Sequence, residues 1–436
     1  MPDLADISEL RRYEFSRLAA TGTVYLDYTG SALYPASLVC RDMHRLTQQV
    51  LGNPHSDSAP SAASTDAIET ARAQTLRFVD ADPAVYDVVF TSNASGAMRI
   101  LADSFPFRAG SRLVLTADNH NSVNGLTVTA RRKRAAVEHV PLNPELRALD
   151  PTPWLTQATA PSLFAFPAQS NFSGVRHPLQ WIAEAQDRGY RVLLDAAAFA
   201  PAHRLSLRAT PADFVALSYY KLFGYPTGIG ALIARRDALA ELRARSYFGG
   251  GTVEFVSVQN GMTRLKAGAE GWEDGTPNFL AMPAICDGLS WLESVGVNRI
   301  RDHVASLTNA LLERLSALGD RVVIHGPAGT EARGGTIAFN LRRAGQWIPF
   351  EIVESAARAR GLAIRGGCFC NPGAAEHAFQ MPARKARRCL RGEFSIARFR
   401  ECLGDGPVGA IRASMGIASS IEDVDALTEF VAELTA

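Results

Sequence analysis

The sequence has little cysteine, no excess of charge and no long apolar run. Six cysteines in 436 residues are too few for a fold built on disulfides, so we expect a reducing, cytoplasmic setting with buried or reactive thiols. A formal net charge of +1 produces no field that would attract nucleic acid or an anionic membrane. No stretch of about 18 apolar residues occurs, and residues 1–10 lack the apolar run of a signal peptide. We therefore expect no nucleic-acid partner and no membrane partner.

Lysine is also scarce, since only four of the 45 basic residues are lysine and the others are arginine. Lys133 and Lys385 lie in basic clusters and Lys266 lies in a polar stretch, where arginine would serve as well. Lys221 alone lies in an apolar, aromatic stretch, residues 218–224. Because an amine can lose its proton and attack a carbonyl, whereas a guanidinium cannot, Lys221 is a candidate nucleophile.

Short apolar runs alternate with helix-like segments through the first two thirds of the chain. They cover residues 24–27, 88–92, 112–118, 163–168, 191–196, 214–219 and 230–234. Several are continuous rather than alternating, which is typical of strands covered on both faces. This pattern predicts an α/β large domain over residues 22–288 with a mostly parallel, seven-stranded sheet. The periodicity from residue 289 to residue 436 predicts a smaller α+β domain, which a helix within residues 1–21 is expected to join.

Small or polar residues follow five of these runs, at the strand ends where ligands bind in α/β sheets. In chain order they are Ala94 and Ser95, His120, Gln169 and Asn171, Asp195, and Ser218 just before Lys221. Each has an ordinary explanation on its own, such as a helix cap, a loop histidine or a turn. Together they place an anion cradle, an aromatic ring, amides, a carboxylate and an apolar lysine at one sheet edge. That set matches the phosphate, ring, pyridine nitrogen and aldehyde of pyridoxal 5′-phosphate (PLP).

The order and spacing of these residues resemble the fold-type I PLP enzymes of the class V aminotransferase and cysteine desulfurase group. The similarity runs through nearly the whole chain, and further matching stretches are residues 25–30, 52–56 and 273–278. The most specific is residues 365–373, Arg-Gly-Gly-Cys-Phe-Cys-Asn-Pro-Gly. Within the group, the chain is most similar to the N-terminal desulfurase domain of molybdenum cofactor sulfurases.

The resemblance implies which residues would bind the cofactor. Lys221 would be the Schiff-base lysine, Asp195 would pair with the pyridinium nitrogen, and His120 would stack on the ring and move protons. The other contacts would be Ala94, Ser95 and Ser218 to the phosphate, Asn171 with Gln169 to the ring oxygen, and Thr276 to the phosphate of the partner subunit. The resemblance therefore also implies a homodimer with shared active sites.

On the substrate side, Arg412 would bind the carboxylate of an amino acid, because a guanidinium offers a fixed fork of donors. Gly30 and Arg365 lie in the stretches that match the family's substrate side. Cys370 aligns best with the family's persulfide-forming cysteine, and Cys368 is the second candidate. The implied reaction converts L-cysteine to L-alanine and transfers the sulfur to a cysteine persulfide, and then to an acceptor protein or small molecule.

Other interpretations stay open from the residues alone. The same cofactor could serve an aminotransferase or a C–S β-lyase, and a non-catalytic sulfur-relay or scaffold protein could keep the fold. No second cysteine pair or histidine cluster lies near Cys368 and Cys370 in the sequence, so we expect no metal. Ala375 stands where the sulfurases carry a further cysteine, and their large C-terminal domain has no counterpart in these 436 residues. Both features weigh against sulfuration of a molybdenum cofactor.

Overall fold

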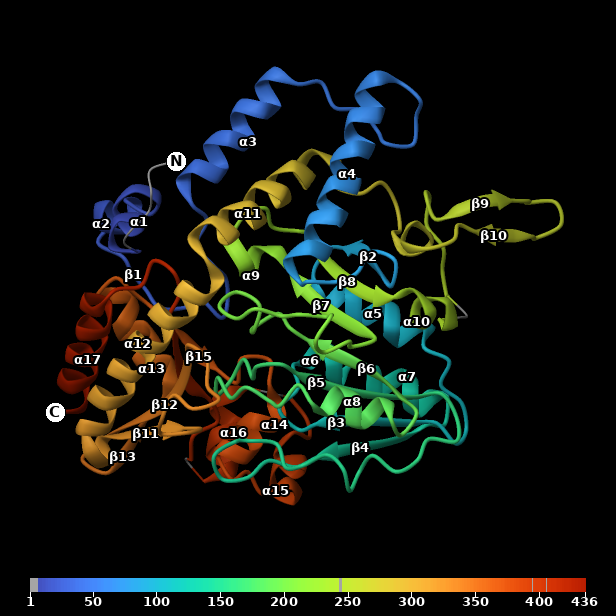
Figure 1. Cartoon of the computed structure of the whole chain (residues 1–436). Helices are drawn as coiled ribbons and strands as arrows, with labels where there is room; N and C mark the ends of the chain where they lie inside the picture. Colours follow the sequence, from blue (N-terminus) through green and yellow to red (C-terminus); the bar gives the residue numbers. More distant parts are fainter. Residues whose placement is uncertain (1–6, 243–244, 394, 405) are drawn as a thin grey trace.

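The computed structural model describes residues 7–242, 245–393, 395–404 and 406–436, and its centre is a seven-stranded sheet (Figure 1). The strands lie in the order β2-β8-β7-β6-β5-β3-β4. Their bounds are β2 (Tyr86–Thr91), β3 (Arg112–Thr116), β4 (Ala136–Val140), β5 (Ser162–Pro167), β6 (Tyr190–Asp195), β7 (Phe214–Ser218) and β8 (Gly230–Arg235). Only β8 is antiparallel to its neighbours, β2 and β7. The predicted α/β fold with a mostly parallel, seven-stranded sheet is confirmed.

One predicted strand lies elsewhere. The run at residues 24–27 forms β1 (Val24–Tyr25), which pairs in parallel with β14 (Leu362–Ala363) outside the main sheet. The seventh strand of the main sheet is β4 at its edge, where most residues are at least partly exposed. An edge strand that carries Glu138 and His139 has no continuous apolar run, so the pattern did not reveal it.

Alternate residues of the strands pack on opposite faces of the sheet. In β5, Leu163 and Ala165 belong to the core on one face, and Phe164 and Phe166 to the core on the other. The first face is covered by α5 (Ala94–Ser104), α7 (Leu126–Arg132) and α10 (Arg236–Glu241), and the second by α4 (Ala59–Phe78), α8 (Trp181–Gln186) and α11 (Met282–Val295). Because helices bury both faces, the central strands are mostly apolar.

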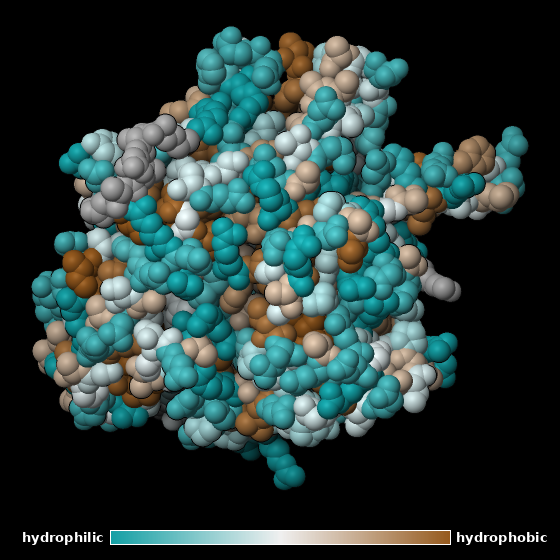
Figure 2. All heavy atoms as spheres, in the orientation of Figure 1, coloured by the Kyte–Doolittle hydropathy of each residue, from teal (hydrophilic) through white to brown (hydrophobic). Residues whose placement is uncertain are grey.

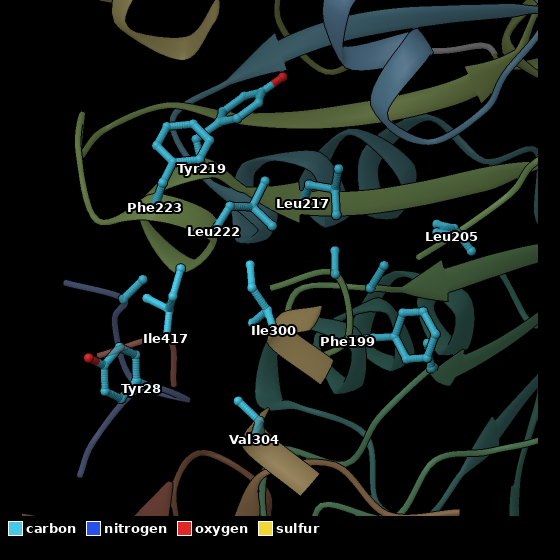
Figure 3. Packing of buried hydrophobic residues seen from close by; sticks show 14 of the residues in the cluster. Tyr28, Phe199, Leu205, Leu217, Tyr219, Leu222, Phe223, Ile300, Val304 and Ile417 are labelled. Atoms are coloured by element: carbon cyan, nitrogen blue, oxygen red, sulfur yellow. The ribbon is translucent and has the colours of Figure 1, made fainter. Parts of the chain in front are cut away.

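A smaller antiparallel sheet packs beside the first. It contains β11 (Val322–His325), β12 (Thr336–Arg343), β16 (Ala410–Ser414) and β15 (Arg365–Gly367), with β13 (Gln346–Ile348) paired on β12, and it packs with α12 (Val297–Ala317), α13 (Phe350–Ala359) and α17 (Ile421–Thr435). Figure 3 shows Ile300 and Val304 of α12 in the same apolar cluster as Leu217 of β7 and Leu222 of α9 (Tyr219–Phe223). One core therefore joins the two sheets. The predicted domain boundary at residue 288 falls within α11, a continuous helix.

The N-terminal segment packs on the smaller part through an ion pair. It contains α1 (Ile7–Glu14) and α2 (Arg17–Thr21), and Arg11 of α1 donates to Asp423 of α17 (Nη2 to Oδ1, 2.9 Å). Other helical elements elsewhere in the chain are α3 (Ala36–Gln48), α6 (Asn121–Asn124) and the 3-10 turns η1 (Ala269–Trp272), η2 (Phe279–Ala281) and η3 (Gly319–Arg321).

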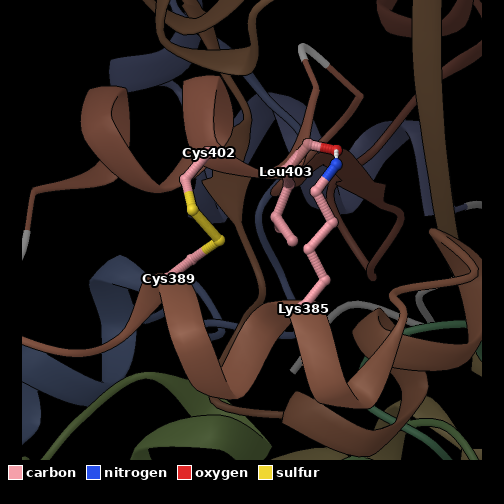
Figure 4. Close-up of a disulfide and its surroundings, with 4 residues drawn as sticks. All are labelled: Lys385, Cys389, Cys402 and Leu403. Carbon is pink, nitrogen blue, oxygen red and sulfur yellow. Dashed lines mark hydrogen bonds between the residues drawn. A yellow bond between two sulfur atoms is a disulfide. The ribbon is translucent and has the colours of Figure 1, made fainter.

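Three short helices, α14 (Pro372–Ala378), α15 (Ala383–Cys389) and α16 (Ile396–Leu403), form an excursion between β15 and β16. Cys389 and Cys402 form a disulfide that joins α15 to α16, and Lys385 Nζ donates to the Leu403 carbonyl (3.0 Å; Figure 4). The expectation that none of the cysteines is paired was wrong for these two. Helices of seven and eight residues are marginal on their own, so the cross-link supplies order that the sparse core here does not. Cys40, Cys286, Cys368 and Cys370 are free.

A hairpin of β9 (Val253–Val256) and β10 (Thr263–Leu265) projects from the body of the molecule (Figure 1). Its exposed side chains include Phe255, Val258 and Met262, and Figure 2 shows brown and tan atoms along this arm. In the part of the chain that the structure describes, none of the helices combines the length and apolar character needed to cross a membrane.

Candidate active site

A pocket of about 140 Å³ lies at the carboxyl ends of β2, β3, β5, β6 and β7. Eight of the predicted residues line it, namely Ala94, Ser95, His120, Gln169, Asn171, Asp195, Ser218 and Lys221. Ser122 and Tyr220 line it as well. Residues from five separate strand ends thus come together as the sheet topology requires.

Lys221 lies on α9, directly after β7, and its residue is partly buried. Among the described residues, its amine makes no hydrogen bond and no ion pair. Burial lowers the pKa of Lys221, and the charge of Asp195 opposes this effect. A lysine whose neutral form is favoured and whose amine is unengaged is suited to nucleophilic attack. The helix ends at Gly224 (φ 79°), where a Cβ would lie 2.3 Å from the Tyr34 nitrogen, so only glycine allows this turn.

Asp195 and His120 line the same pocket as Lys221. Asp195 ends β6 in a buried position, and its Oδ1 accepts from the Ala197 N–H (3.0 Å). His120 caps α6, because its Nδ1 accepts from the Ser122 N–H (3.1 Å). Burial lowers the pKa of His120. A neutral imidazole whose Nδ1 accepts carries its proton on Nε2, so His120 combines its structural role with a flat face in the pocket.

The N-terminus of α5 forms the predicted anion cradle. Asn93 caps the helix by accepting from the Gly96 N–H (3.0 Å), and the Ala94 N–H donates to the Ser218 hydroxyl (2.9 Å). The Ser95 and Ser122 hydroxyls are 2.5 Å apart. Three hydroxyls and the positive end of an eleven-residue helix converge here, as a phosphate requires. Ser122 was missed by the sequence prediction, although its place two residues after His120 was the available signal.

The two amide side chains that follow β5, Gln169 and Asn171, differ in their hydrogen bonds. Asn171 Nδ2 donates to the Phe369 carbonyl (2.7 Å), and its Oδ1 accepts from Asn371 Nδ2 (2.9 Å). Gln169 Oε1 is buried without a hydrogen-bond partner among the described residues. An orphaned buried oxygen indicates a missing donor. Asn171 therefore holds the cysteine turn, whereas the Gln169 oxygen is buried against Gly334.

The predicted cysteines lie on a tight turn beside the pocket. The Asn371 N–H donates to the Cys368 carbonyl (2.9 Å), and the Asn121 N–H donates to the Cys370 carbonyl (2.7 Å). Asn371 Nδ2 also donates to the Asp118 carbonyl (2.7 Å). A Cys370 thiolate opposes the lowering of the pKa of Lys221, which places this cysteine within electrostatic reach of the pocket.

Arg412 and Arg365 share one carboxylate. Arg412 on β16 is buried, and it donates to the Asn171 carbonyl (3.0 Å) and to Asp27 Oδ1 (2.8 Å). Arg365 Nη2 donates to Asp27 Oδ2 (2.6 Å). A Cβ on Gly30 would lie 2.5 Å from both Arg365 and Asp27, so this position needs glycine. Each terminal nitrogen of Arg412 carries two N–H groups and bonds one acceptor among the described residues, which leaves donors for a ligand carboxylate. The role of Asp27 was missed, although it ends the first apolar run.

Thr276 is the one predicted cofactor contact that lies outside the pocket. It lines a separate cavity of about 580 Å³, and Asn53 Nδ2 lies 3.5 Å from its hydroxyl. A single chain does not bring it to Lys221. No group of three or more histidine, cysteine, aspartate or glutamate side chains suited to a metal occurs among the described residues.

Comparison with known proteins gives consistent matches. The family model described as aminotransferase class-V matches residues 24–427. Proteins named molybdenum cofactor sulfurase are similar over 98% of this chain, at 35% identity in Bos taurus and 33% in Arabidopsis thaliana. The chain spans 51% and 58% of the length of these two relatives.

Solved structures of cysteine desulfurases share the fold. The apo structure of cysteine desulfurase from Thermococcus onnurineus NA1 matches with a TM-score of 0.81 and 25% identity, over 98% of this chain and 97% of that one. A cysteine desulfurase from Escherichia coli, in an S-sulfonic acid form, matches with a TM-score of 0.77 and 23% identity, over 99% of both chains.

The residues of the pocket fit PLP. The cradle of α5 suits its phosphate, the Asp195 carboxylate suits a protonated pyridine nitrogen, and the unengaged Lys221 amine suits its aldehyde. With the family match over most of the sequence, the chain belongs to the aminotransferase class-V family of PLP-dependent enzymes.

Proposed function

We propose that the protein is a cysteine desulfurase, which takes the sulfur of L-cysteine as a persulfide on Cys370 and releases L-alanine. The observation that carries this proposal is the place of the cysteine turn, since Asn171, which lines the pocket with Lys221, donates to the Phe369 carbonyl of the turn and accepts from Arg412. A lysine for the cofactor, an arginine for a carboxylate and a thiol for sulfur are thus combined in one site. The similarity to a solved cysteine desulfurase over nearly the whole chain supports the same reaction.

The chain's own residues would hold PLP through its phosphate and its pyridine nitrogen. Ala94, Ser95, Ser122 and Ser218 surround the position of the phosphate, and Asp195 would keep the pyridine nitrogen protonated. When bound, PLP takes up the electron pair released at the substrate α carbon. The flat imidazole of His120, neutral because of burial, would stack on the ring.

Lys221 and Arg412 would act on the substrate itself. Arg412 would hold the substrate carboxylate through its terminal nitrogens, since each carries two N–H groups and bonds one acceptor among the described residues. The Lys221 amine, once freed by the substrate amine, would move the proton at the α carbon. The Cys370 thiolate would then attack the substrate sulfur, and alanine would leave.

The test is to incubate the purified protein, loaded with PLP, with L-cysteine and to measure the products. Alanine in equal amount to persulfide or sulfide supports desulfuration. Pyruvate instead of alanine would identify a C–S β-lyase, and formation of a keto acid only with an amino acceptor would identify an aminotransferase. A protein that neither binds PLP nor turns over L-cysteine would be a non-catalytic relay or scaffold.

We also propose that two copies of the chain form a homodimer with shared sites. Two observations support this: Thr276 lies on a cavity apart from Lys221, and the β9–β10 hairpin exposes Val258 and Met262. The double variant Val258→Asp with Met262→Asp places charge on this arm. We expect it to sediment near 47.0 kDa, whereas the unchanged chain sediments at twice that mass. Equal sedimentation of the two proteins would contradict a dimer held by the hairpin.

A further inference from the structure

Cys368 and Cys370 occupy the first and third positions of one tight turn. The Asn371 N–H closes the turn on the Cys368 carbonyl, and the two central residues, Phe369 and Cys370, have φ values of 54° and 56°. Non-glycine residues adopt two successive left-handed conformations only where their surroundings hold them. Because the Cα atoms of residues two apart lie at most about 7 Å from each other, the two thiols stay within mutual reach.

The two ends of the turn have different neighbours. The Cys370 carbonyl accepts from Asn121 at the start of α6, next to the pocket. Cys368 instead follows β15, where the Gly366 N–H donates to Glu354 of α13 (3.1 Å) on the outer side of the small sheet. Both cysteine residues are exposed, while Phe369 between them is buried.

The pocket is too small for a macromolecular acceptor. A volume of about 140 Å³ admits no part of a folded protein, and the proposed reaction requires Cys370 to reach the substrate sulfur there. Cys368 is exposed at the β15 end of the turn, so an acceptor in solvent can reach it there while Cys370 serves the pocket. A second thiol at this place would carry sulfur outward without moving the turn.

Resting on the proposed desulfurase function, we propose that Cys368 is a relay thiol that takes the transferred sulfur from Cys370 and presents it to the acceptor. The Cys368 thiolate attacks the terminal sulfur of the Cys370 persulfide. The bond from Cys370 Sγ to that sulfur breaks, and a bond from Cys368 Sγ to it forms. The proton stays on the transferred sulfur, and Cys370 leaves as a thiolate. The step is an exchange without net oxidation or reduction, so it needs no further reactant.

The two thiols can be assayed separately, because cleavage after Arg365, Phe369 and Phe379 places them on different peptides, Gly366–Phe369 and Cys370–Phe379. The PLP-loaded protein is given less than one equivalent of L-cysteine, quenched at intervals by alkylation and analysed by mass spectrometry. We expect the extra sulfur to appear first on Cys370–Phe379 and then on Gly366–Phe369. In Cys370→Ser, neither peptide should gain sulfur.

The variant Cys368→Ser should retain the extra sulfur on Cys370. Its release of sulfur to glutathione should slow by about tenfold, since the external thiol must then reach the inner position. Cys40→Ser is the matched control, because Cys40 is an exposed free cysteine on α3, and it should behave as the unchanged protein.

Three results overturn the relay. They are sulfur that stays on Cys370 throughout in the unchanged protein, a Cys368→Ser variant that supplies glutathione at the unchanged rate, or a Cys368–Cys370 disulfide with free sulfide. Absence of extra sulfur from both peptides would instead overturn the proposed desulfurase function, and the relay with it.

Discussion

Replacement of Asn371 by alanine tests whether the cysteine turn is held in place by its neighbours. The side chain is fully buried, and it donates to the Asp118 carbonyl and to Asn171 Oδ1 while it accepts from the Ala374 N–H at the start of α14. The variant leaves two buried acceptors without a donor, at about 1–3 kcal/mol each. It also removes a helix cap worth about 1 kcal/mol. Because these terms overlap, we expect a loss of about 3 kcal/mol in the free energy of unfolding.

The rate of persulfide formation should also fall in this variant. Without the Asn371 side chain, fewer contacts offset the cost of the left-handed backbone at Phe369 and Cys370, about 1–3 kcal/mol per residue, so we expect the turn to relax and the thiol to move. A displacement of about 1 Å can cost about a hundredfold in rate. Asn371→Ala should therefore form persulfide about a hundredfold more slowly, while PLP absorption and L-cysteine binding change little, since Lys221 lies on α9 and Arg412 on β16.

The assay is rapid-quench detection of the persulfide beside urea unfolding of the same sample. Asn371→Asp is the matched control, because it keeps the cap on Ala374 and loses the two donors. It should lose rate as the alanine variant does and lose more stability, because it buries a carboxylate against the Asp118 carbonyl and Asn171 Oδ1. A folded alanine variant that forms persulfide at the unchanged rate would refute the role of Asn371 in holding the cysteine turn.

Other variants address single residues of the site and the core. Lys221→Ala should lose the absorption of lysine-bound PLP and all turnover, whereas Cys370→Ala should keep that absorption and form no persulfide; persulfide from Cys370→Ala would exclude the thiol's role. Asp27→Asn leaves the buried Arg412 without its carboxylate and should lower the free energy of unfolding by about 3 kcal/mol in urea, and an unchanged midpoint would contradict this. Burial lowers the pKa of His203 to about 4, so an unfolded chain with a pKa near 6.5 binds the proton first, and stability falls as the pH drops from 6.5 to 4. The full effect is about 3 kcal/mol, and His203→Phe should lose that part of the pH dependence of urea unfolding; equal pH dependence in both proteins would argue against it.

The fold was predictable from the sequence where buried strands consist of continuous apolar runs. Strands such as β5 and β7 are buried along their whole length, so their apolar runs stood out. The edge strand β4 is half exposed, and its polar residues hid it. The run ending at Asp27 was recognisable as a strand but not assignable to a sheet, because its partner β14 lies more than 330 residues further along the chain.

The pocket was predictable for a topological reason, whereas the contacts that hold the cysteine turn were not. His120, Asp195 and Lys221 each follow a parallel strand, so their convergence follows from sheet order alone. The engagement of Asn171 by Asn371 depends on where the excursion from the second sheet packs. The disulfide of α15 and α16 depends in the same way on the packing of two short helices. Sequence spacing carries no information on such contacts.

The pairing of β15 with β16 explains why an acidic side chain lies between Arg365 and Arg412. The register of these antiparallel strands places Arg365 directly opposite Arg412. Like charges at directly opposed positions are destabilising, and here one of them is buried. Asp27, two residues beyond the end of β1, pairs with both guanidinium groups, so a carboxylate between them stabilises the strand pairing. A substrate carboxylate would bring a second anion to the same two cations, and a one-residue slip of β15 would turn Arg365 away from both. The register that carries Cys368 and Cys370 to the pocket is therefore stabilised by the same charges that would select an amino-acid substrate.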